Sequence, residues 1–467
     1  MAEDTTTTCR PTGTAAETTV FPLSSAQRRL WFLHQLGRGD AYTVPTLYEI
    51  TGGLDVPALA EAVDSLVSRQ EVLRARITES RGWPGQRLGP PDAVRLEVAD
   101  LRGHRDAERE ARRQVLERVA APFDPIAGPL TRIVLFRLTG TRALLLVAAH
   151  HLVFDGGSRP VLEAELSAAY SAARGEVPEL GPPPVGLGYL DHAARDAAAR
   201  DPEDDADDLA YWREELADAT VLTLTPDATS PGAGGPGDGP AGAEVVLPLP
   251  PALDAALAEF ALRNRVTPFA VGMAVQAFLL GWSGGVDDVV VGTAADGRLD
   301  PDVENTVGCF VNTVAIRTRL VGDPSLAELA AQVRDRVLDA HDHQGLPFDE
   351  VVAGLGLERS GEDNPVFRHW FDVTDERSDT GGGGLRLPGC DTALLAPPVV
   401  AAHFEVETHL RYTDQGMAVG VVYDSGVFTE DWARRFAARY ARLLAWAVDH
   451  PTRPLSRLPL LDEPERR

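Results

Sequence analysis

The residues best suited to chemistry lie at positions 150–156 (HHLVFDG), directly after an apolar run at 143–149. A strand that ends in two histidines before a glycine-containing turn holds an imidazole base at a fixed edge. A carboxylate, Asp155, follows four residues after His151. We therefore expect this turn to carry proton-transfer chemistry.

The same residues fit other interpretations. His150 and His151 are also compatible with a buried structural pair, or with metal ligation, because His and Asp are both ligands. Metal ligation is disfavoured because no further His or Cys cluster supplies more ligands, and neighbouring side chains on a strand point apart. Residues 156–158 (GGS) resemble the surroundings of a phosphopantetheine attachment serine, but the spacing differs. We instead expect Ser158 to cap a helix that runs to about Arg174.

Several elements are expected to position this turn. Residues 131–138 and 143–150, separated by TGTR, predict a hairpin that ends at the histidines. Apolar residues at helical spacing over 59–67 predict an amphipathic helix that packs on a sheet. In the second half, we expect strands at 286–292 and 310–317, a buried helix at 269–282, and another helix after 323–324. The Gly- and Pro-rich stretch at 225–243 predicts a surface loop or a disordered segment near a lobe junction at 200–245.

Seven segments, in order, resemble the motifs of nonribosomal peptide synthetase condensation domains. They are residues 23–33 (LSSAQRRLWFL), 69–74 (RQEVLR), 150–156 (HHLVFDG), 189–191 (YLD), 307–313 (VGCFVNT), 343–350 (HQGLPFDE) and 364–367 (NPVF). The chain also departs from the family pattern. Gln70 stands where the family usually has His, Gly157 stands where a bulkier residue is common, and the segment after Tyr189 lacks the usual aromatic ending.

The resemblance implies a mixed α/β (α+β) fold. Two lobes, each like chloramphenicol acetyltransferase, would form a V-shaped pseudodimer with a tunnel between them. Residues 1–20 would be a disordered leader, 21–200 the first lobe, and 201–467 the second lobe. In that fold, a floor segment and a latch segment of the second lobe bridge to the first. Residues at about 292–300 suit the floor, and residues at about 375–390 suit the latch.

The resemblance also implies roles for the residues around the turn. His151 would hydrogen-bond the attacking group, either removing its proton or orienting it. His150 would have a structural or orienting role. Asp155 would pair with Arg298 of the floor motif, and Gly156 would allow a close backbone approach.

Three further residues are expected near the substrates. Gly157 would widen the substrate channel and admit a bulky acceptor. Asn312 and Thr313 lie in a family motif near the tunnel, although a role as strand hydrogen-bond partners is equally open. Arg298 completes the expected substrate-binding set together with Gly157 and Asn312.

The implied function is that of an acyltransferase in natural-product biosynthesis. An acyl or aminoacyl group would arrive as a phosphopantetheine thioester on a peptidyl or acyl carrier protein. An amine or hydroxyl nucleophile would attack it and form an amide or an ester. The absence of adenylation and carrier motifs favours a free-standing enzyme with a small-molecule acceptor over an excised domain.

Composition narrows the partners. With 44 basic and 70 acidic residues, the formal charge is −26, which disfavours nucleic acid. The three cysteines are scattered, so neither a disulfide framework nor a metal knuckle is expected. No apolar stretch has membrane length, and the Thr-rich start lacks a signal-peptide pattern, so we expect a cytoplasmic protein without bound metal or cofactor. Arginines on a helix at about 430–450 form a candidate carrier-protein patch or a solvated face.

Two other functions stay open. An epimerization domain shares the HHxxxDG motif but inverts the configuration of a carrier-bound aminoacyl group. A non-catalytic module would instead use the same scaffold to recruit carrier proteins or partner enzymes. The opening motif at 23–33 and the motif at 307–313 favour condensation.

Overall fold

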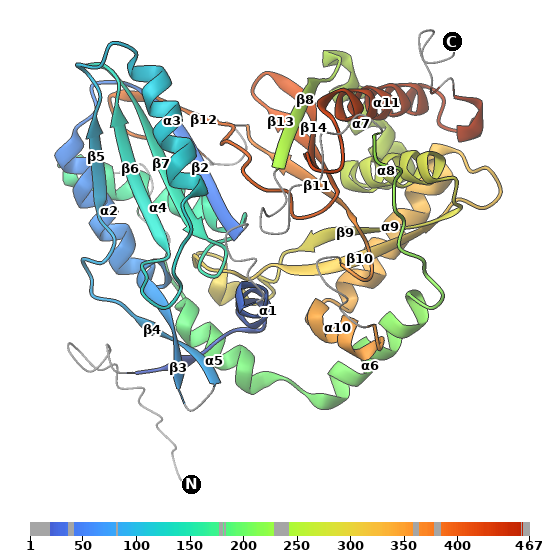
Figure 1. The fold of residues 1–467 in the computed structure, drawn as a ribbon, viewed down its shortest axis with the longest axis horizontal. Coiled ribbons are helices and arrows are strands. Elements are labelled where there is room, and N and C mark those ends of the chain that lie inside the picture. Colours follow the sequence, from blue (N-terminus) through green and yellow to red (C-terminus); the bar gives the residue numbers. More distant parts are fainter. Residues whose placement is uncertain are drawn as a thin grey trace. The chain divides into compact units, whose positions relative to one another are not determined.

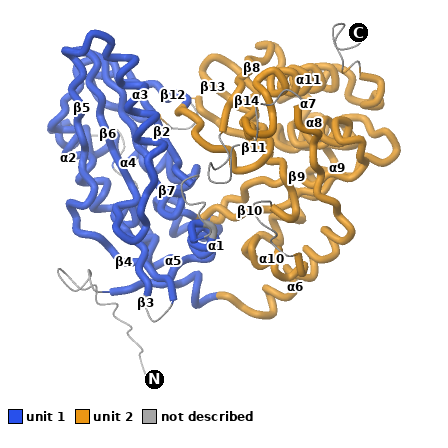
Figure 2. The backbone as a smooth tube through the Cα atoms, in the orientation of Figure 1, with its two compact units in different colours: residues 1–199, 298–309, 385–396 blue, residues 200–297, 310–384, 397–467 orange. Residues whose placement is uncertain are grey.

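The computed structural model describes residues 19–35, 42–80, 83–176, 181, 184–227, 242–357, 364–377, 384–458 and 460. The chain divides into two compact units (Figure 2). Unit 1 comprises residues 1–199, 298–309 and 385–396, and unit 2 comprises residues 200–297, 310–384 and 397–467. Unit 1 therefore includes two segments from the second half of the sequence.

Unit 1 contains two sheets (Figure 1). The larger one has five strands in the order β12-β2-β7-β6-β5, and a smaller one has the order β1-β4-β3. The strands are β1 (Phe21–Pro22), β2 (Thr43–Gly52), β3 (Ala75–Ser80), β4 (Trp83–Leu88), β5 (Leu96–Asp100), β6 (Thr131–Arg137), β7 (Arg142–His150) and β12 (Cys390–Leu395). The helices are α1 (Ser25–Leu33), α2 (Val56–Arg69), α3 (Ala107–Ala120), α4 (Ser158–Ala173) and α5 (Tyr189–Ala199), and the 3-10 helices are η3 (Glu71–Arg74) and η4 (Pro301–Val303).

The expected hairpin is β6 and β7, which pair antiparallel with Thr131 opposite Ala149. Every residue of β7 after Arg142 is buried, which explains its uninterrupted apolar sequence. On its other edge β7 pairs with β2, and Thr43 lies opposite His150. The last residue of β7 is thus held by β2 on one side and, on the other, by a hydrogen bond from its N–H to the carbonyl oxygen of Leu130, just before β6.

Helices α2 and α4 pack against each other in unit 1. Helix α2 is the amphipathic helix expected from the apolar spacing at 59–67, and Asp55 caps it by accepting a hydrogen bond from the Ala58 N–H. Helix α4 begins directly after the histidine turn. The turn is therefore bounded by a central strand and by a helix that is packed along its length.

The segment from the second half completes the five-stranded sheet. Strand β12 pairs antiparallel with β2, with Cys390 opposite Gly52. Gly52 has φ of +122°, and a Cβ there would approach the carbonyl oxygen of Gly389 to 2.6 Å. Glycine is therefore required where these two strands meet.

Unit 2 is built on a six-stranded sheet in the order β10-β9-β11-β13-β14-β8. Its strands are β8 (Gly242–Pro248), β9 (Asp288–Ala295), β10 (Asn312–Arg319), β11 (His369–Asp375), β13 (Val406–Thr413) and β14 (Gly416–Asp424). Its helices are α6 (Pro202–Glu215), α7 (Pro251–Asn264), α8 (Pro268–Gly284), α9 (Leu326–Asp342), α10 (Phe348–Gly354) and α11 (Glu430–Asp449), with the 3-10 helix η5 (Leu455–Arg457). Helix α8 is the buried helix expected at 269–282, and Thr267 caps it.

Several boundaries differ from the sequence expectations. Ser158 is the first residue of α4 and not its cap; Gly157 occupies the cap position without a side-chain hydrogen bond. The second-half strand expected at 310–317 begins at Asn312, and residues 307–311 belong to no strand. Strand β8 begins at Gly242, within the loop expected at 225–243, of which residues 228–241 lie outside the described residues.

The expected leader and latch are only partly described. Of the leader at 1–20, residues 1–18 lie outside the described part of the chain. Of the latch at 375–390, residues 378–383 lie outside it, and Cys390 is the first residue of β12. Within the described ranges, no single helix is long and apolar enough to cross a membrane; the bent pair α7 and α8, at 99°, passes that test by length and composition alone.

Candidate active site in unit 1

The two histidines of the motif have different surroundings. His150 is the last residue of β7, is 1% exposed, and accepts a hydrogen bond at Nδ1 from the Leu152 N–H at 3.0 Å. An accepting Nδ1 carries no proton, so this ring stabilises the turn as a neutral imidazole. His151 lies in the turn itself and is partly exposed, and its N–H donates to the carbonyl oxygen of Tyr42 at 2.8 Å.

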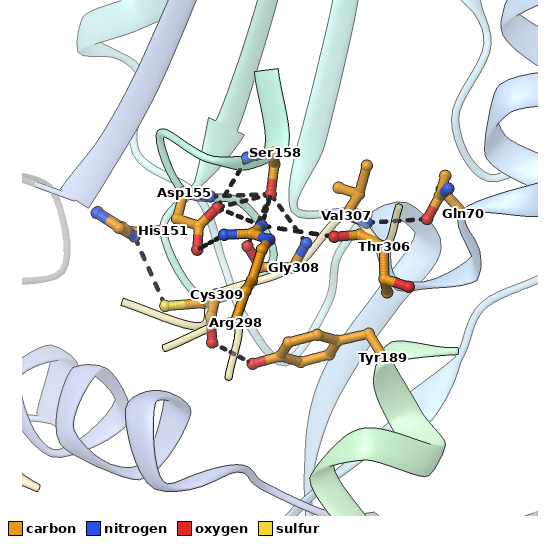
Figure 3. A network of polar contacts seen from close by, with 10 residues as sticks. All are labelled: Gln70, His151, Asp155, Ser158, Tyr189, Arg298, Thr306, Val307, Gly308 and Cys309. Atoms are coloured by element: carbon orange, nitrogen blue, oxygen red, sulfur yellow. Dashed lines mark hydrogen bonds and ion pairs between the residues drawn. The ribbon is translucent and has the colours of Figure 1, made fainter. Parts of the chain in front are cut away.

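Asp155 forms the ion pair with Arg298 that the resemblance implied (Figure 3). Its Oδ1 lies 2.8 Å from one guanidinium nitrogen and its Oδ2 lies 3.0 Å from the other. The two side chains are 2% and 8% exposed. Such a bidentate, buried pair fixes the relative position of the turn and of residue 298.

Ser158 connects this ion pair to the segment at 306–308 (Figure 3). Its backbone N–H donates to Asp155 Oδ1 at 2.9 Å, and its hydroxyl lies 2.8 Å from the same oxygen. The hydroxyl also accepts from the Gly308 N–H at 3.0 Å and lies 2.9 Å from the Gly308 carbonyl oxygen. The residue type indicates a helix cap, but the Ser158 hydroxyl is instead a bridge between distant segments.

Gln70, which departs from the family pattern, holds the other end of that segment. It is 2% exposed and ends helix α2. Its Oε1 accepts from the Val307 N–H at 2.9 Å, and its Nε2 donates to the carbonyl oxygen of Asn305 at 3.0 Å and to Glu165 at 3.3 Å. The neutral amide of Gln70 thus pairs with one N–H donor and with two oxygen acceptors, and it has no proton to lose or gain as the pH changes.

The two glycines of the turn have different surroundings. A Cβ on Gly157 would lie 2.3 Å from a guanidinium nitrogen of Arg298 and 2.9 Å from its central carbon. Gly157 therefore makes room for Arg298, and the expectation that it widens a substrate channel is wrong. A Cβ on Gly156 would meet no atom of the described residues within 4 Å, so no protein contact there requires glycine.

Cys309 is one of three scattered cysteines in the sequence, yet its sulfur lies 3.7 Å from Nδ1 of His151. It is fully buried, and burial together with the nearby Asp155 charge raises the pKa of its thiol. Tyr189, also buried, donates its hydroxyl to the Cys309 carbonyl oxygen at 2.6 Å, and Ser24 lies 2.9 Å from that hydroxyl. Motifs far apart in the sequence therefore meet beside His151.

Asn312 is not among these residues; it belongs to unit 2. Its Nδ2 donates to the carbonyl oxygens of Gln344 and Leu346, both at 2.9 Å. Its Oδ1 accepts from the N–H groups of Thr313 and Phe348. These four bonds occupy the amide, so the geometry gives Asn312 a structural role and not the expected substrate contact. Thr313 pairs with Ala294 of β9 in the sheet.

Within the described part of the chain, no group of three or more His, Cys, Asp or Glu side chains is arranged to hold a metal ion. The groups around His151 instead form a polar network of hydrogen bonds and one ion pair. This arrangement can hold an imidazole, move a proton at it, and keep the turn rigid while doing so.

Comparison with known proteins assigns the chain to a family. The family model of the condensation domain matches residues 17–467. The chain belongs to the condensation domain family. This condensation domain is 33% identical over 455 residues to the dimodular nonribosomal peptide synthase of Bacillus subtilis (strain 168), with 94% of the chain covered. It is 31% identical over 449 residues to malpinin synthetase of Mortierella alpina, with 95% of the chain covered. It spans 18% of the length of the first relative and 6% of the length of the second.

Solved structures agree with this assignment. The X-domain from teicoplanin biosynthesis has 26% sequence identity and a TM-score of 0.79, with 97% of this chain and 99% of that chain covered. The first condensation domain of the calcium-dependent antibiotic synthetase, bound to a substrate analogue, has 25% identity and a TM-score of 0.78, with 95% and 100% covered. The mixed α/β fold expected from the motifs, with units like chloramphenicol acetyltransferase, is confirmed.

Four residues of the network were missed as functional candidates: Ser24, Ser158, Tyr189 and Cys309. Ser24, Tyr189 and Cys309 each lie within a recognised motif, and that membership was the available signal. Their residue types gave no further hint, because a serine, a tyrosine or a lone cysteine is common in structural roles. Ser24, Tyr189 and Cys309 become functional candidates only because the fold connects them to His151 through a chain of contacts in unit 1.

Proposed function

We propose that this condensation domain transfers an acyl or aminoacyl group from a carrier-protein phosphopantetheine thioester to an amine or hydroxyl nucleophile. The observation that carries the proposal is the placement of His151. It directly follows a buried central strand and is the first residue of a turn that the Asp155–Arg298 ion pair holds rigid. A thioester is already activated, so the protein has mainly to align the reactants and move one proton.

In the proposed reaction, the bonds and protons exchange between the two substrates and His151. The nucleophile attacks the thioester carbonyl and forms a C–N or C–O bond, while the C–S bond breaks. His151 accepts the proton that the nucleophile loses and returns it to the departing phosphopantetheine sulfur. His150, whose Nδ1 already accepts a backbone hydrogen bond, serves the turn and not the proton. Asp155 and Arg298 position the turn and do not relay protons.

The nature of the acceptor is part of the proposal. We take a diffusible amine or alcohol as the acceptor to be tested first. The argument that Gly157 leaves room for a bulky acceptor does not support it, because Arg298 fills that space. Amide and ester formation therefore stand equally open to the experiment below.

The carrier protein is the proposed partner. Helix α11 is the docking patch suggested by the sequence, but its arginines have internal contacts. Arg434 pairs with Glu430, Arg435 pairs with Asp227, and Arg442 donates to the carbonyl oxygen of Leu460. Arg439 lies over the ring of Trp282. The helix thus offers less unpaired positive charge than its sequence suggests.

We further propose that the enzyme needs no bound metal or organic cofactor. The activated acyl group supplies the driving force, and a neutral imidazole supplies the proton acceptor. Turnover should continue in the presence of a chelator and without ATP. Loss of turnover in EDTA that added zinc restores would contradict this proposal. A cytoplasmic location is proposed because Cys309 and Cys390 are both free thiols, as expected in a reducing compartment.

The experiment that tests the function supplies a loaded acyl-carrier thioester with a panel of amines and alcohols. Mass spectrometry follows the product and the unloaded carrier. His151→Ala is the inactive control, and His104→Ala, at an exposed position, is the matched histidine control. Product that depends on His151 but not on His104 supports condensation. A carrier that stays loaded with every acceptor refutes it.

A second candidate is recruitment without catalysis. The X-domain from teicoplanin biosynthesis, a structural relative, has also been solved in complex with OxyB. If this candidate is right, the chain binds a partner protein, and the His151→Ala variant binds it as tightly as the wild type does. An epimerization domain is the remaining alternative, and chiral analysis of the acyl group recovered from the carrier distinguishes it from condensation.

A further inference from the structure

The thiol of Cys309 contacts the proposed base, His151, from a segment more than 150 residues away in the sequence (Figure 3). We propose that Cys309 is a positioning residue: its sulfur holds Nδ1 of His151, so that Nε2 is the nitrogen presented to the reacting atoms. The proposal rests on the proposed function of His151. It adds a residue that the motif analysis had not assigned to any role.

The backbone that carries Cys309 is fixed on several sides. The Val307 N–H donates to Gln70, and the Gly308 N–H donates to the Ser158 hydroxyl. The carbonyl oxygen of Cys309 accepts the hydroxyl of Tyr189 at 2.6 Å. Hydrogen bonds from three consecutive residues therefore hold the Cα of Cys309, and its short side chain has little freedom to leave the imidazole.

The ring of His151 is oriented by this contact. Figure 3 shows Nδ1 directed toward the sulfur and the other ring nitrogen directed away from the network. For Nε2 to accept a proton, Nδ1 must carry the ring proton, so Nδ1–H donates a weak hydrogen bond to the sulfur at 3.7 Å. Nδ1 and Nε2 lie on different sides of the imidazole, so holding the first determines where the second points.

A buried neutral thiol suits this task. Burial raises the pKa of Cys309, so the side chain stays protonated at neutral pH. A thiol contacts Nδ1 without the negative charge by which a carboxylate would stabilise the imidazolium and slow the return of the proton. Full burial also keeps the sulfur from acting as a nucleophile itself.

The test compares three substitutions that separate packing from polarity. Cys309→Val fills the space with apolar atoms, Cys309→Ala empties it, and Cys309→Ser keeps an acceptor for Nδ1–H. Cys390→Ala is the matched control, because it removes a thiol from β12 in the same unit. We expect Val and Ala to lower kcat about 5- to 10-fold, the size of one lost hydrogen bond, with the donor KM within about twofold.

Serine should recover at least half of the wild-type kcat, and Cys390→Ala should keep all of it. Equal kcat for Val and the wild type would overturn the proposal. So would a fall in kcat that follows thermal stability across Ala, Val and Ser alike, because that pattern describes packing alone.

A readout independent of turnover separates this proposal from the proposed function. In protein with 15N-labelled histidine, the Nδ1 resonance of His151, assigned with His151→Gln, should shift in Cys309→Val and not in Cys390→Ala. If the wild type forms no product but this shift is present, condensation fails while the positioning contact stands. If the resonance is unchanged in Cys309→Val, the positioning proposal fails whatever the activity.

Discussion

Replacing Asp155 by Asn should destabilise unit 1 strongly, and the structure sets the size of the loss. The carboxylate is 2% exposed and accepts two hydrogen bonds from Arg298 and one from the Ser158 N–H. Asparagine preserves the volume and can still accept from Ser158. Its Nδ2, however, would face a guanidinium nitrogen as a second donor, and the charge of Arg298 would stay buried without its counterion. Breaking a buried pair from one side costs about 3–5 kcal/mol of unfolding free energy.

Hydrogen exchange in a denaturant series measures this loss within unit 1. Peptides from residues 143–158 and 298–309 report the opening of the strand end and of the segment joined to it. The matched control is Asp300→Asn, in the same segment, whose pair with Arg195 has side chains 37% and 53% exposed. That exposed pair should contribute no more than about 1 kcal/mol.

A double variant sharpens the test. Asp155→Asn combined with Arg298→Met removes both charges, so its loss should be smaller than the sum of the two single losses. The reasoning would be refuted if Asp155→Asn cost no more than Asp300→Asn, or if the two single losses added to within about 0.5 kcal/mol.

Other outcomes follow from the same structure. His151→Ala should lower kcat by roughly 10²- to 10⁴-fold while the thermal unfolding curve stays close to that of the wild type; wild-type turnover in the folded variant would remove His151 from the mechanism. Gly157→Ala should lower the midpoint of unfolding because its Cβ would displace Arg298, whereas Gly156→Ala should leave the midpoint within about 1 °C; equal midpoints would contradict the role assigned to Gly157. Burial lowers the pKa of His369 and of His409 to about 4, so as pH falls from about 6.5 to 4 the unfolded chain binds protons that the folded unit 2 does not. The unfolding free energy of unit 2 should decline over that window, and His369→Gln should decline less steeply; parallel pH curves for the two proteins would count against this assignment.

The local architecture of the candidate site was largely accessible from the sequence. The apolar run at 143–149 is buried throughout in β7, which is why an unbroken apolar run after a turn could place the histidines at a strand end. The Asp155–Arg298 pair came from motif resemblance alone, since no local pattern connects residues so far apart. Helix α8 was recognisable because its residues are apolar on every side, as a fully buried helix requires.

The errors concern contacts that only the folded chain creates. Ser158 has the residue type of a helix cap, but its hydroxyl binds Gly308, a partner that helix propensity cannot indicate. Gly157 looked like free space because a sequence does not show which side chain fills the gap that a glycine leaves. Cys309 looked inert because one cysteine carries no spacing pattern, and its neighbour His151 comes from a distant segment.

Unit 1 is assembled from three separate segments of the sequence, which has a consequence for how this chain folds during synthesis and how it can be recombined with relatives. During synthesis, Asp155 emerges long before Arg298, and β2 emerges long before β12 pairs with its edge. A ribosome must therefore pass residue 396 before unit 1 has all of its parts. Exchanging residues 1–199 between relatives would transplant an incomplete body, lacking both the guanidinium beside its turn and its outermost strand. A recombination design for this family should move residues 298–309 and 385–396 together with the N-terminal portion.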